Sequence, residues 1–217
     1  MQKLTENIWR LKPPGGIFND MVVASLFPNL KPGARAALLH RAFEKEEILR
    51  LKPGLYCLAN EFRASSMHPF AIAGVLYAPS YVSLESALWY HSLIPEAIQQ
   101  VASVIAERSR AYSNPLGHFT YTRIPCRNLK AGVRADAMDS GGWAYIAGPL
   151  RALADVVYLR NEISWKQNGL SFLTESLRIE PENWTAFSRD SFDEVLDTFR
   201  NIRVREYLEG LRKEMRR

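Results

Sequence analysis

Only two cysteines, Cys57 and Cys126, occur among the 217 residues. They lie far apart and form no CxxC pair, so neither a disulfide framework nor a cysteine-based zinc site is expected. No apolar run approaches the ~18 residues that a membrane span requires. The first ten residues also lack the apolar segment of a signal peptide. These absences predict a cytoplasmic protein with reduced cysteines and no membrane contact.

Enzyme signatures are missing as well. The patterns GxGxxG, GxxxxGK[ST], HExxH and GxSxG do not occur. The four histidines fall in four different predicted elements, which does not favour a metal site. We therefore predict a protein that is not an enzyme, with no catalytic residue, no cofactor and no metal.

What the sequence does contain is a basic, globular composition. Lysine and arginine number 28 against 23 acidic residues, a net charge of +5. Residues 1–62 carry +3 and residues 63–149 carry +2, while residues 150–217 are balanced at zero. A basic balance favours an anionic partner such as nucleic acid.

The first 62 residues predict three short helices and a β-hairpin. A second helix is expected to begin at Asn19 or Asp20, and a third to run from about Ala34 to Lys45. Two alternating runs that flank Pro53-Gly54 predict the hairpin. The expected apolar face of the third helix consists of Leu38, Leu39, Ala42 and Phe43. With Leu51 and Leu55, the larger members of that face would form a small core.

This layout is that of a winged helix-turn-helix, in which the third helix enters the major groove and the hairpin contacts phosphate. The candidate DNA-binding residues are Arg35, His40, Arg41, Lys45, Arg50 and Lys52. Glu44 and the pair Glu46-Glu47 argue against DNA binding, because they repel phosphate unless they face away. A small helical lid with ordinary surface charges is the alternative interpretation.

The remainder predicts a mixed α/β domain with a helical C-terminal part. Strands are expected at about Val101–Ala106, Phe119–Thr122 and Trp143–Ala147, whereas residues 128–142 give no clear signal. Ser83 is expected to cap a helix, and a helix beginning at Pro149 carries Asp155 on an apolar face. A buried acid needs a partner, and Arg151 four residues earlier is the candidate, in a structural role. We predict an α+β protein with a winged-helix domain at 1–62 and a second domain at 63–217.

Five short segments, in this order, resemble the AbiEi-type antitoxins of bacterial type IV toxin–antitoxin systems. The segments are Pro53–Leu58, Pro79–Leu88, Ser92–Glu96, Gly117–Tyr121 and Pro149–Leu159, and the resemblance covers roughly residues 15–160. The family's "P-x-K-A-L-x-D" segment occurs here with Arg151 in place of lysine. The third helix also runs into Phe43–Glu47 rather than into a short glycine-containing entry to the wing.

The resemblance implies a transcriptional regulator with an N-terminal winged helix and a C-terminal antitoxin domain. Such a protein represses its own operon by binding operator DNA and counteracts a nucleotidyltransferase toxin, generally without forming a stable complex with it. An alternative function is a protein-interaction or adaptor module whose winged helix no longer binds DNA. The net charge of the first segment favours DNA binding, and its acidic Glu44–Glu47 stretch favours the adaptor.

Overall fold

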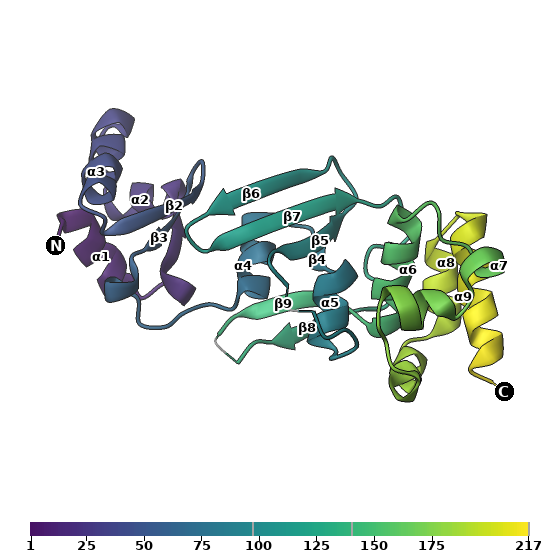
Figure 1. Ribbon diagram of the computed structural model, residues 1–217. Helices are drawn as coiled ribbons and strands as arrows, with labels where there is room; N and C mark the ends of the chain where they lie inside the picture. Colours follow the sequence, from purple (N-terminus) through teal and green to yellow (C-terminus); the bar gives the residue numbers. More distant parts are fainter. Residues whose placement is uncertain (97, 140, 217) are drawn as a thin grey trace.

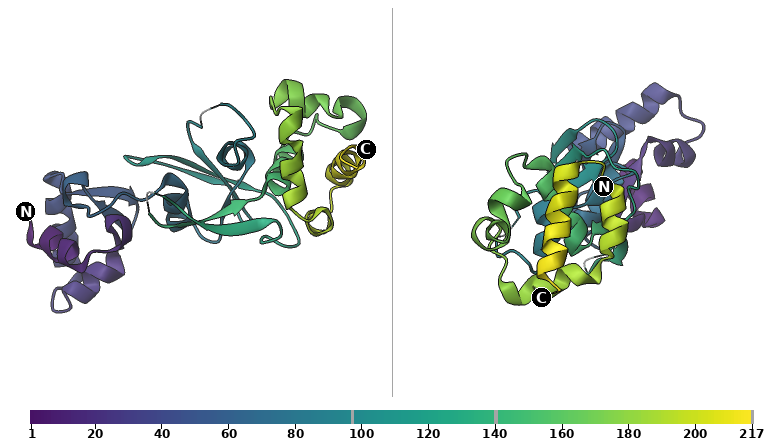
Figure 2. Two further views of the ribbon diagram at one scale, coloured as in Figure 1. Left: turned by 90° about the horizontal axis from the view of Figure 1, so that it is seen from below. Right: turned by 90° about the vertical axis from the view of Figure 1, so that its right-hand side faces the viewer.

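The computed structural model describes residues 1–96, 98–139 and 141–216. It is an α+β structure that combines helices with a mixed β-sheet. The molecule is elongated: an N-terminal unit lies at one end, a sheet in the middle and the C-terminal helices at the other end (Figures 1 and 2). Among the described residues, no helix has the length and apolarity needed to cross a membrane.

The N-terminal unit places three helices against a three-stranded antiparallel sheet of strand order β1-β3-β2. Its elements are α1 (Lys3–Leu11), β1 (Ile17–Asn19), α2 (Asp20–Leu26), α3 (Pro32–Glu44), β2 (Ile48–Lys52) and β3 (Leu55–Leu58), with 3-10 turns at Pro14–Gly16 and Asn60–Phe62. The side chain of Asn19 caps α2 by accepting from the Val22 amide at 3.1 Å, which confirms the predicted start. The hairpin β2–β3 is also confirmed. Helix α3 begins two residues earlier than expected, because Pro32 fits the first helical position.

The core of this unit differs from the predicted one. Its buried cluster draws on every α-helix and strand of the unit and comprises Leu4, Ile8, Phe18, Val23, Phe27, Ala42, Ile48 and Leu58. Of the expected α3 face, only Ala42 is fully buried, and Phe43 is 48% exposed, so placing Phe43 in the core was wrong. Leu51 and Leu55 are buried in the larger cluster of the neighbouring sheet. Apolar contacts therefore cross the predicted domain boundary at residue 62. The division of the chain into two domains at that residue stays a prediction.

The central sheet has six strands in the order β6-β7-β5-β4-β9-β8. The strands are β4 (Tyr81–Val82), β5 (Val101–Ile105), β6 (Arg110–Asn114), β7 (Gly117–Arg123), β8 (Val133–Ala137) and β9 (Trp143–Ala147). The β5–β7 and β4–β9 pairs are parallel, and the other pairs are antiparallel. Helices α4 (Pro69–Leu76) and α5 (Leu84–Tyr90) pack against it. The strands expected at residues 101–106, 119–122 and 143–147 are confirmed.

Four strands gave no usable sequence signal. Strand β8 lies in the segment 128–142 that the sequence left unassigned, of which residue 140 lies outside the described part of the chain. Strands β1 and β4 have only three and two residues, too few for an alternation to register. Strand β6 is mostly exposed, so its residues show no buried face to recognise.

The C-terminal part is helical, as predicted. It contains α6 (Pro149–Leu159), α7 (Trp165–Asn168), a π-helical turn (Phe172–Ser176), a 3-10 segment (Pro181–Arg189), α8 (Phe192–Thr198) and α9 (Ile202–Glu214). Helix α6 is the central one: its first nine residues are all buried, and it contacts α5, α8 and α9. Asp190 lies at the start of α6, where its carboxylate accepts from the backbone N–H of Leu150 at 2.9 Å. This carboxylate satisfies a backbone donor that the helix itself leaves unpaired.

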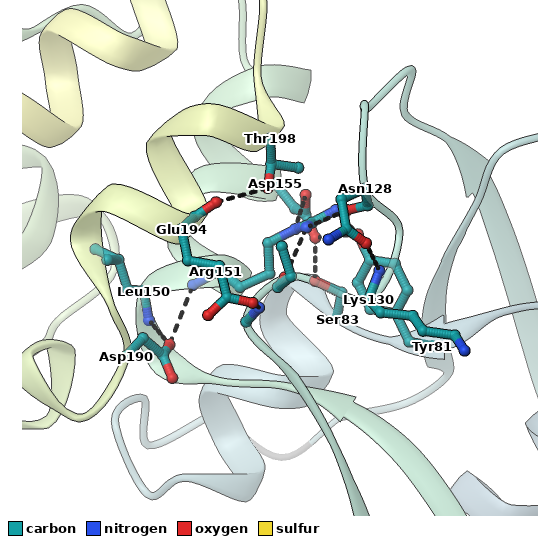
Figure 3. Close-up of polar contacts among 12 residues, drawn as sticks. Tyr81, Ser83, Asn128, Lys130, Leu150, Arg151, Asp155, Asp190, Glu194 and Thr198 are labelled. Atoms are coloured by element: carbon teal, nitrogen blue, oxygen red, sulfur yellow. Dashed lines mark hydrogen bonds and ion pairs between the residues drawn. The ribbon is translucent and has the colours of Figure 1, made fainter.

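A buried ion pair joins α6 to the sheet (Figure 3). Nε of Arg151 lies 3.2 Å from Oδ1 of Asp155, and both side chains are 0% exposed, which confirms the predicted pair. Oδ2 of Asp155 accepts from the hydroxyls of Tyr81 at 2.8 Å and Ser83 at 2.7 Å. The prediction that the Ser83 side chain caps α5 was wrong: the residue has the cap position, but its hydroxyl donates to the buried carboxylate instead.

Both terminal nitrogens of the Arg151 guanidinium are also hydrogen-bonded. Nη1 donates to the carbonyls of Ala131 at 2.8 Å and Asn128 at 3.3 Å, and Nη2 donates to the Tyr81 hydroxyl at 2.6 Å. Burial raises the pKa of Asp155, and the guanidinium and the two hydroxyl donors oppose that rise. Burial and the neighbouring Asp155 raise the pKa of Tyr81 well above its usual value, so this hydroxyl remains a donor.

We predict that Asp155→Ala lowers the free energy of unfolding by about 3–5 kcal/mol, because it leaves a buried guanidinium without its counter-charge. The double variant Arg151→Met/Asp155→Leu removes both charges and should cost less than Asp155→Ala alone. Urea unfolding of the three proteins measures this. A loss below about 1 kcal/mol for Asp155→Ala would contradict the assigned role.

Candidate nucleic-acid interface

Helix α3 stands at the far end of the N-terminal unit and projects away from the central sheet (Figure 1). Of its thirteen residues only Ala42 is buried, while Arg35, Leu38 and Leu39 are partly exposed. Successive residues turn by about 100° around a helix axis, so Leu38, Leu39 and Ala42 share the inner face. Arg35 lies on the same side one turn earlier, at the edge where it lines the adjoining groove. His40 and Arg41 fall on the outer, exposed face. This face has no covering element in the described chain and is free for a partner.

The six predicted DNA-binding residues separate into three groups in the structure. Arg35, His40 and Arg50 line one groove. Arg41 and Lys45 are exposed and lie on the other flank of α3, since they do not line this groove and are one helical turn apart. Lys52 lies apart from all of these, at the junction with the central sheet.

The groove lies between α2, α3 and the β2–β3 hairpin and has a volume of about 740 Å³. Its floor and walls are largely apolar, and Met21 is 76% exposed there, next to Phe43 at 48%. Arg50 lies directly opposite Tyr56 in the hairpin register, so both side chains reach the groove from the same face. The groove thus combines apolar surface with charged side chains of both signs, Arg35 and Arg50 on one hand and Asp20 and Glu44 on the other. Sequence reasoning missed it because Phe43 was placed in the core.

Lys52 is bound within the chain. Its ammonium donates to the carbonyl of Leu76 at 2.5 Å and lies 5.8 Å from the centre of the Tyr112 ring. The side chain of Asn114 adds a further contact by donating to the carbonyl of Leu51 at 3.3 Å. The hairpin end near Lys52 therefore rests on α4 and β6 of the central sheet. No sequence signal indicated this, because the contact joins residues 24 positions apart.

One of the three acidic residues that argued against DNA binding faces inward. Glu47 is 7% exposed, and its carboxylate accepts from the backbone N–H of Gln2 at 2.7 Å and lies 3.4 Å from the Met1 ammonium. Burial alone would raise the pKa of Glu47, but its hydrogen bonds and the nearby ammonium outweigh burial and lower it. Glu46 is exposed, and Glu44 lines the groove. Fewer acidic side chains near α3 are therefore exposed to repel phosphate than the sequence suggests.

The described histidines outside α3 make local contacts. His68 accepts from the Phe70 amide at 3.1 Å, His91 lies 2.8 Å from the Ala147 carbonyl and His118 lies 2.9 Å from the Ser113 hydroxyl. In the part of the chain that the structure describes, no three His, Cys, Asp or Glu side chains are grouped so that they could hold a metal ion. The arrangement around α3 offers binding groups, namely cations, an imidazole and apolar surface.

No protein-family model matches the chain, and no curated protein matches its sequence significantly.

We predict that Glu47→Gln lowers the free energy of unfolding at pH 7 by about 1–2 kcal/mol, because it removes a charge-assisted hydrogen bond and an ion pair. The folded-state pKa of Glu47 is lowered from 4.5. The ionised Glu47 carboxylate therefore stabilises the fold fully above pH 4.5. This stabilisation is lost as the pH falls through the lower pKa of the folded state.

The measurement is urea unfolding of both proteins from pH 7 down to about pH 3. Glu46→Gln is the matched control, since that side chain is exposed one position away. A destabilisation by Glu47→Gln that stays constant over this pH range would contradict the assigned ionisation.

Proposed function

We propose that this protein is a DNA-binding transcriptional autoregulator of the winged-helix type and the antitoxin of a type IV toxin–antitoxin system. The observation that carries the DNA-binding part is α3, a thirteen-residue helix with one buried residue, His40 and Arg41 on its outer face, and a β-hairpin beside it. The order of α1, β1, α2, α3 and hairpin, with strand order β1-β3-β2, supports the winged-helix assignment.

In this proposal the outer face of α3 enters the major groove, where Arg41 and His40 reach base edges. Arg35 lies near the helix N-terminus and, with Lys45 at its C-terminal end, contacts the flanking backbone. Arg50 on β2 contacts phosphate. Lys52 is left out of the interface, because its ammonium is already bound to the Leu76 carbonyl.

The antitoxin part rests on the family resemblance in residues 53–159. The cognate toxin is then a nucleotidyltransferase, and the toxin and the promoter DNA are two separate functional partners. The arrangement of the chain supports a division of labour: α3 lies at one end of the molecule, while most of the resembling segments lie in the central sheet and α6 (Figure 1). A surface that acts against the toxin is therefore available while α3 holds DNA.

A second candidate is a protein-interaction module that does not bind DNA. The exposed Met21 and Phe43 in the α2–α3 groove favour it, because exposed apolar side chains that line a groove are typical of protein-binding surfaces. In that case the groove, not the outer face of α3, is the functional surface.

We predict salt-sensitive binding to the protein's own promoter. If about four to six phosphates are neutralised, the logarithm of the binding constant falls with the logarithm of salt at a slope of roughly −4 to −5. Arg41→Ala should reduce the discrimination between promoter and random DNA by about 1–3 kcal/mol. Arg50→Ala should weaken both DNAs alike. Fluorescence anisotropy titrations at several salt concentrations measure all three.

Lys52→Ala is the matched control, because it removes the same charge from the same strand as Arg50→Ala. Its ammonium is bound within the chain, so we expect DNA affinity to change by no more than about twofold. Equal losses of DNA affinity in Lys52→Ala and Arg50→Ala would contradict the proposed interface, in which Arg50 contacts phosphate and Lys52 does not. No binding at low salt would exclude the DNA-binding function and leave the protein-interaction module.

We also predict that repression and toxin protection separate by point substitution in the full chain. Arg41→Ala/Lys45→Ala changes only exposed side chains of α3 and should abolish promoter repression while cells remain protected from the toxin. A promoter reporter and survival after toxin induction give the two readouts. Loss of protection by a folded double variant at wild-type levels would show that α3 also serves the antitoxin activity.

A further inference from the structure

Strand β8 (Val133–Ala137) ends the central sheet on one side. Within the described part of the chain it pairs only with β9, and in Figure 1 it forms the lower border of the sheet. An edge strand carries unpaired N–H and C=O groups that can bind another strand. Proteins usually block such an edge with proline, a bulge or charged side chains. Strand β8 contains no proline, and its two charged residues, Arg134 and Asp136, have opposite signs.

The register with β9 shows which backbone groups of β8 face outward. The Gly148 N–H donates to the Gly132 carbonyl at 2.7 Å, so this pair is hydrogen-bonded across the hairpin. Hydrogen-bonded and non-hydrogen-bonded pairs alternate along an antiparallel ladder. The backbone groups of Arg134 and Asp136 therefore face β9, and those of Ala135 face the open edge.

The sequence of β8 is complementary to itself in charge. When two copies of Val-Arg-Ala-Asp-Ala pair antiparallel about Ala135, Arg134 of each copy lies opposite Asp136 of the other. We propose that β8 is a self-association edge, through which a second copy of this chain adds to the sheet across a two-fold axis. The twelve strands of the two copies then form one continuous sheet, and the interface is isologous.

The geometry of an antiparallel pair favours this register. The two Ala135 residues exchange both backbone hydrogen bonds, and the N–H of Ala137 in each copy reaches the carbonyl of Val133 in the other, giving about four bonds. The N–H of Val133 is not needed, since it already donates to the Lys130 carbonyl at 3.0 Å. Arg134 and Asp136 fall in the non-hydrogen-bonded positions, where facing side chains approach most closely.

Both charged residues also have neighbours inside their own chain. The carboxylate of Asp136 lies 3.5 Å from the Tyr90 hydroxyl. Burial raises the pKa of Asp190, and Arg134 lies close enough to oppose that rise electrostatically. Arg134 is nevertheless exposed and Asp136 partly exposed. Their two intermolecular ion pairs are therefore added to contacts that the single chain already has.

Exposed aromatic side chains flank the same edge. Tyr145 and Trp143 lie opposite Ala135 and Ala137 in the β8–β9 register, on the alanine face of the hairpin, and are 59% and 70% exposed. The small alanines leave space beside these rings. Pairing of two β8 strands brings two such alanine rows together between the aromatic side chains of the two copies, and this apolar band adds to the backbone hydrogen bonds and ion pairs.

The test is the mass of the full chain in solution, by sedimentation velocity and light scattering over about 1–300 µM. We expect the average mass to rise with concentration from 24.7 kDa towards twice that value. Arg134→Asp places two acids opposite each other and should weaken the dimer about tenfold or more. Arg134→Asp/Asp136→Arg exchanges the charges and should restore it to within about threefold.

Arg108→Asp is the matched control, because it makes the same charge change on an exposed residue outside β8. Ala135→Pro removes an outward N–H from an edge strand and should abolish the dimer while thermal unfolding remains cooperative. A constant monomer mass over the whole range would overturn the proposal. So would a dimer that withstands Ala135→Pro, or one that the charge exchange does not restore. These outcomes do not decide whether α3 binds DNA, which the promoter titrations measure separately.

Discussion

The buried pair of Arg151 and Asp155 is the constraint on which the rest of the structure depends. A guanidinium and a carboxylate that are both 0% exposed have lost their water, so every remaining donor and acceptor must find a partner in the chain. Tyr81 and Ser83 at the end of β4 supply hydroxyls, and the loop before β8 supplies carbonyls. Helix α6, the sheet and the loop therefore have one arrangement that satisfies all of these groups.

The N-terminal unit is attached to this framework through its hairpin. Leu51 and Leu55 pack into the core of the central sheet, and Lys52 is bound to the Leu76 carbonyl. Within residues 1–96, 98–139 and 141–216, the side of the unit that carries α3 has no such contact, and Arg41 and Phe43 of that helix are exposed. The turn end of this hairpin thus attaches the unit to the central sheet. The face of the hairpin that carries Arg50 lines the groove beside α3.

Local features of the fold could be predicted from the sequence, and long-range contacts could not. The cap at Asn19, the Pro53-Gly54 hairpin and the ion pair of Arg151 with Asp155 depend on residues within about four positions of one another, where spacing alone fixes the geometry. The partner of Lys52 and the inward side of Glu47 depend on segments that meet only in the folded chain. The placement of Phe43 in the core was wrong for a related reason. Its hydrophobicity can be seen in the sequence, but the absence of a segment that packs over it cannot.

The proposed self-association has a direct consequence for the proposed DNA binding. Strand β8 borders the central sheet, whereas α3 lies at the end of the N-terminal unit, so pairing through β8 leaves α3 of both copies uncovered. An isologous dimer relates its two α3 helices by a two-fold axis, and such a pair matches inverted half-sites, not direct repeats. A monomer imposes no such symmetry on its operator. Under the two proposals together, the symmetry of the operator is set at β8, by the complementary positions of Arg134 and Asp136, and not by the residues proposed to contact DNA.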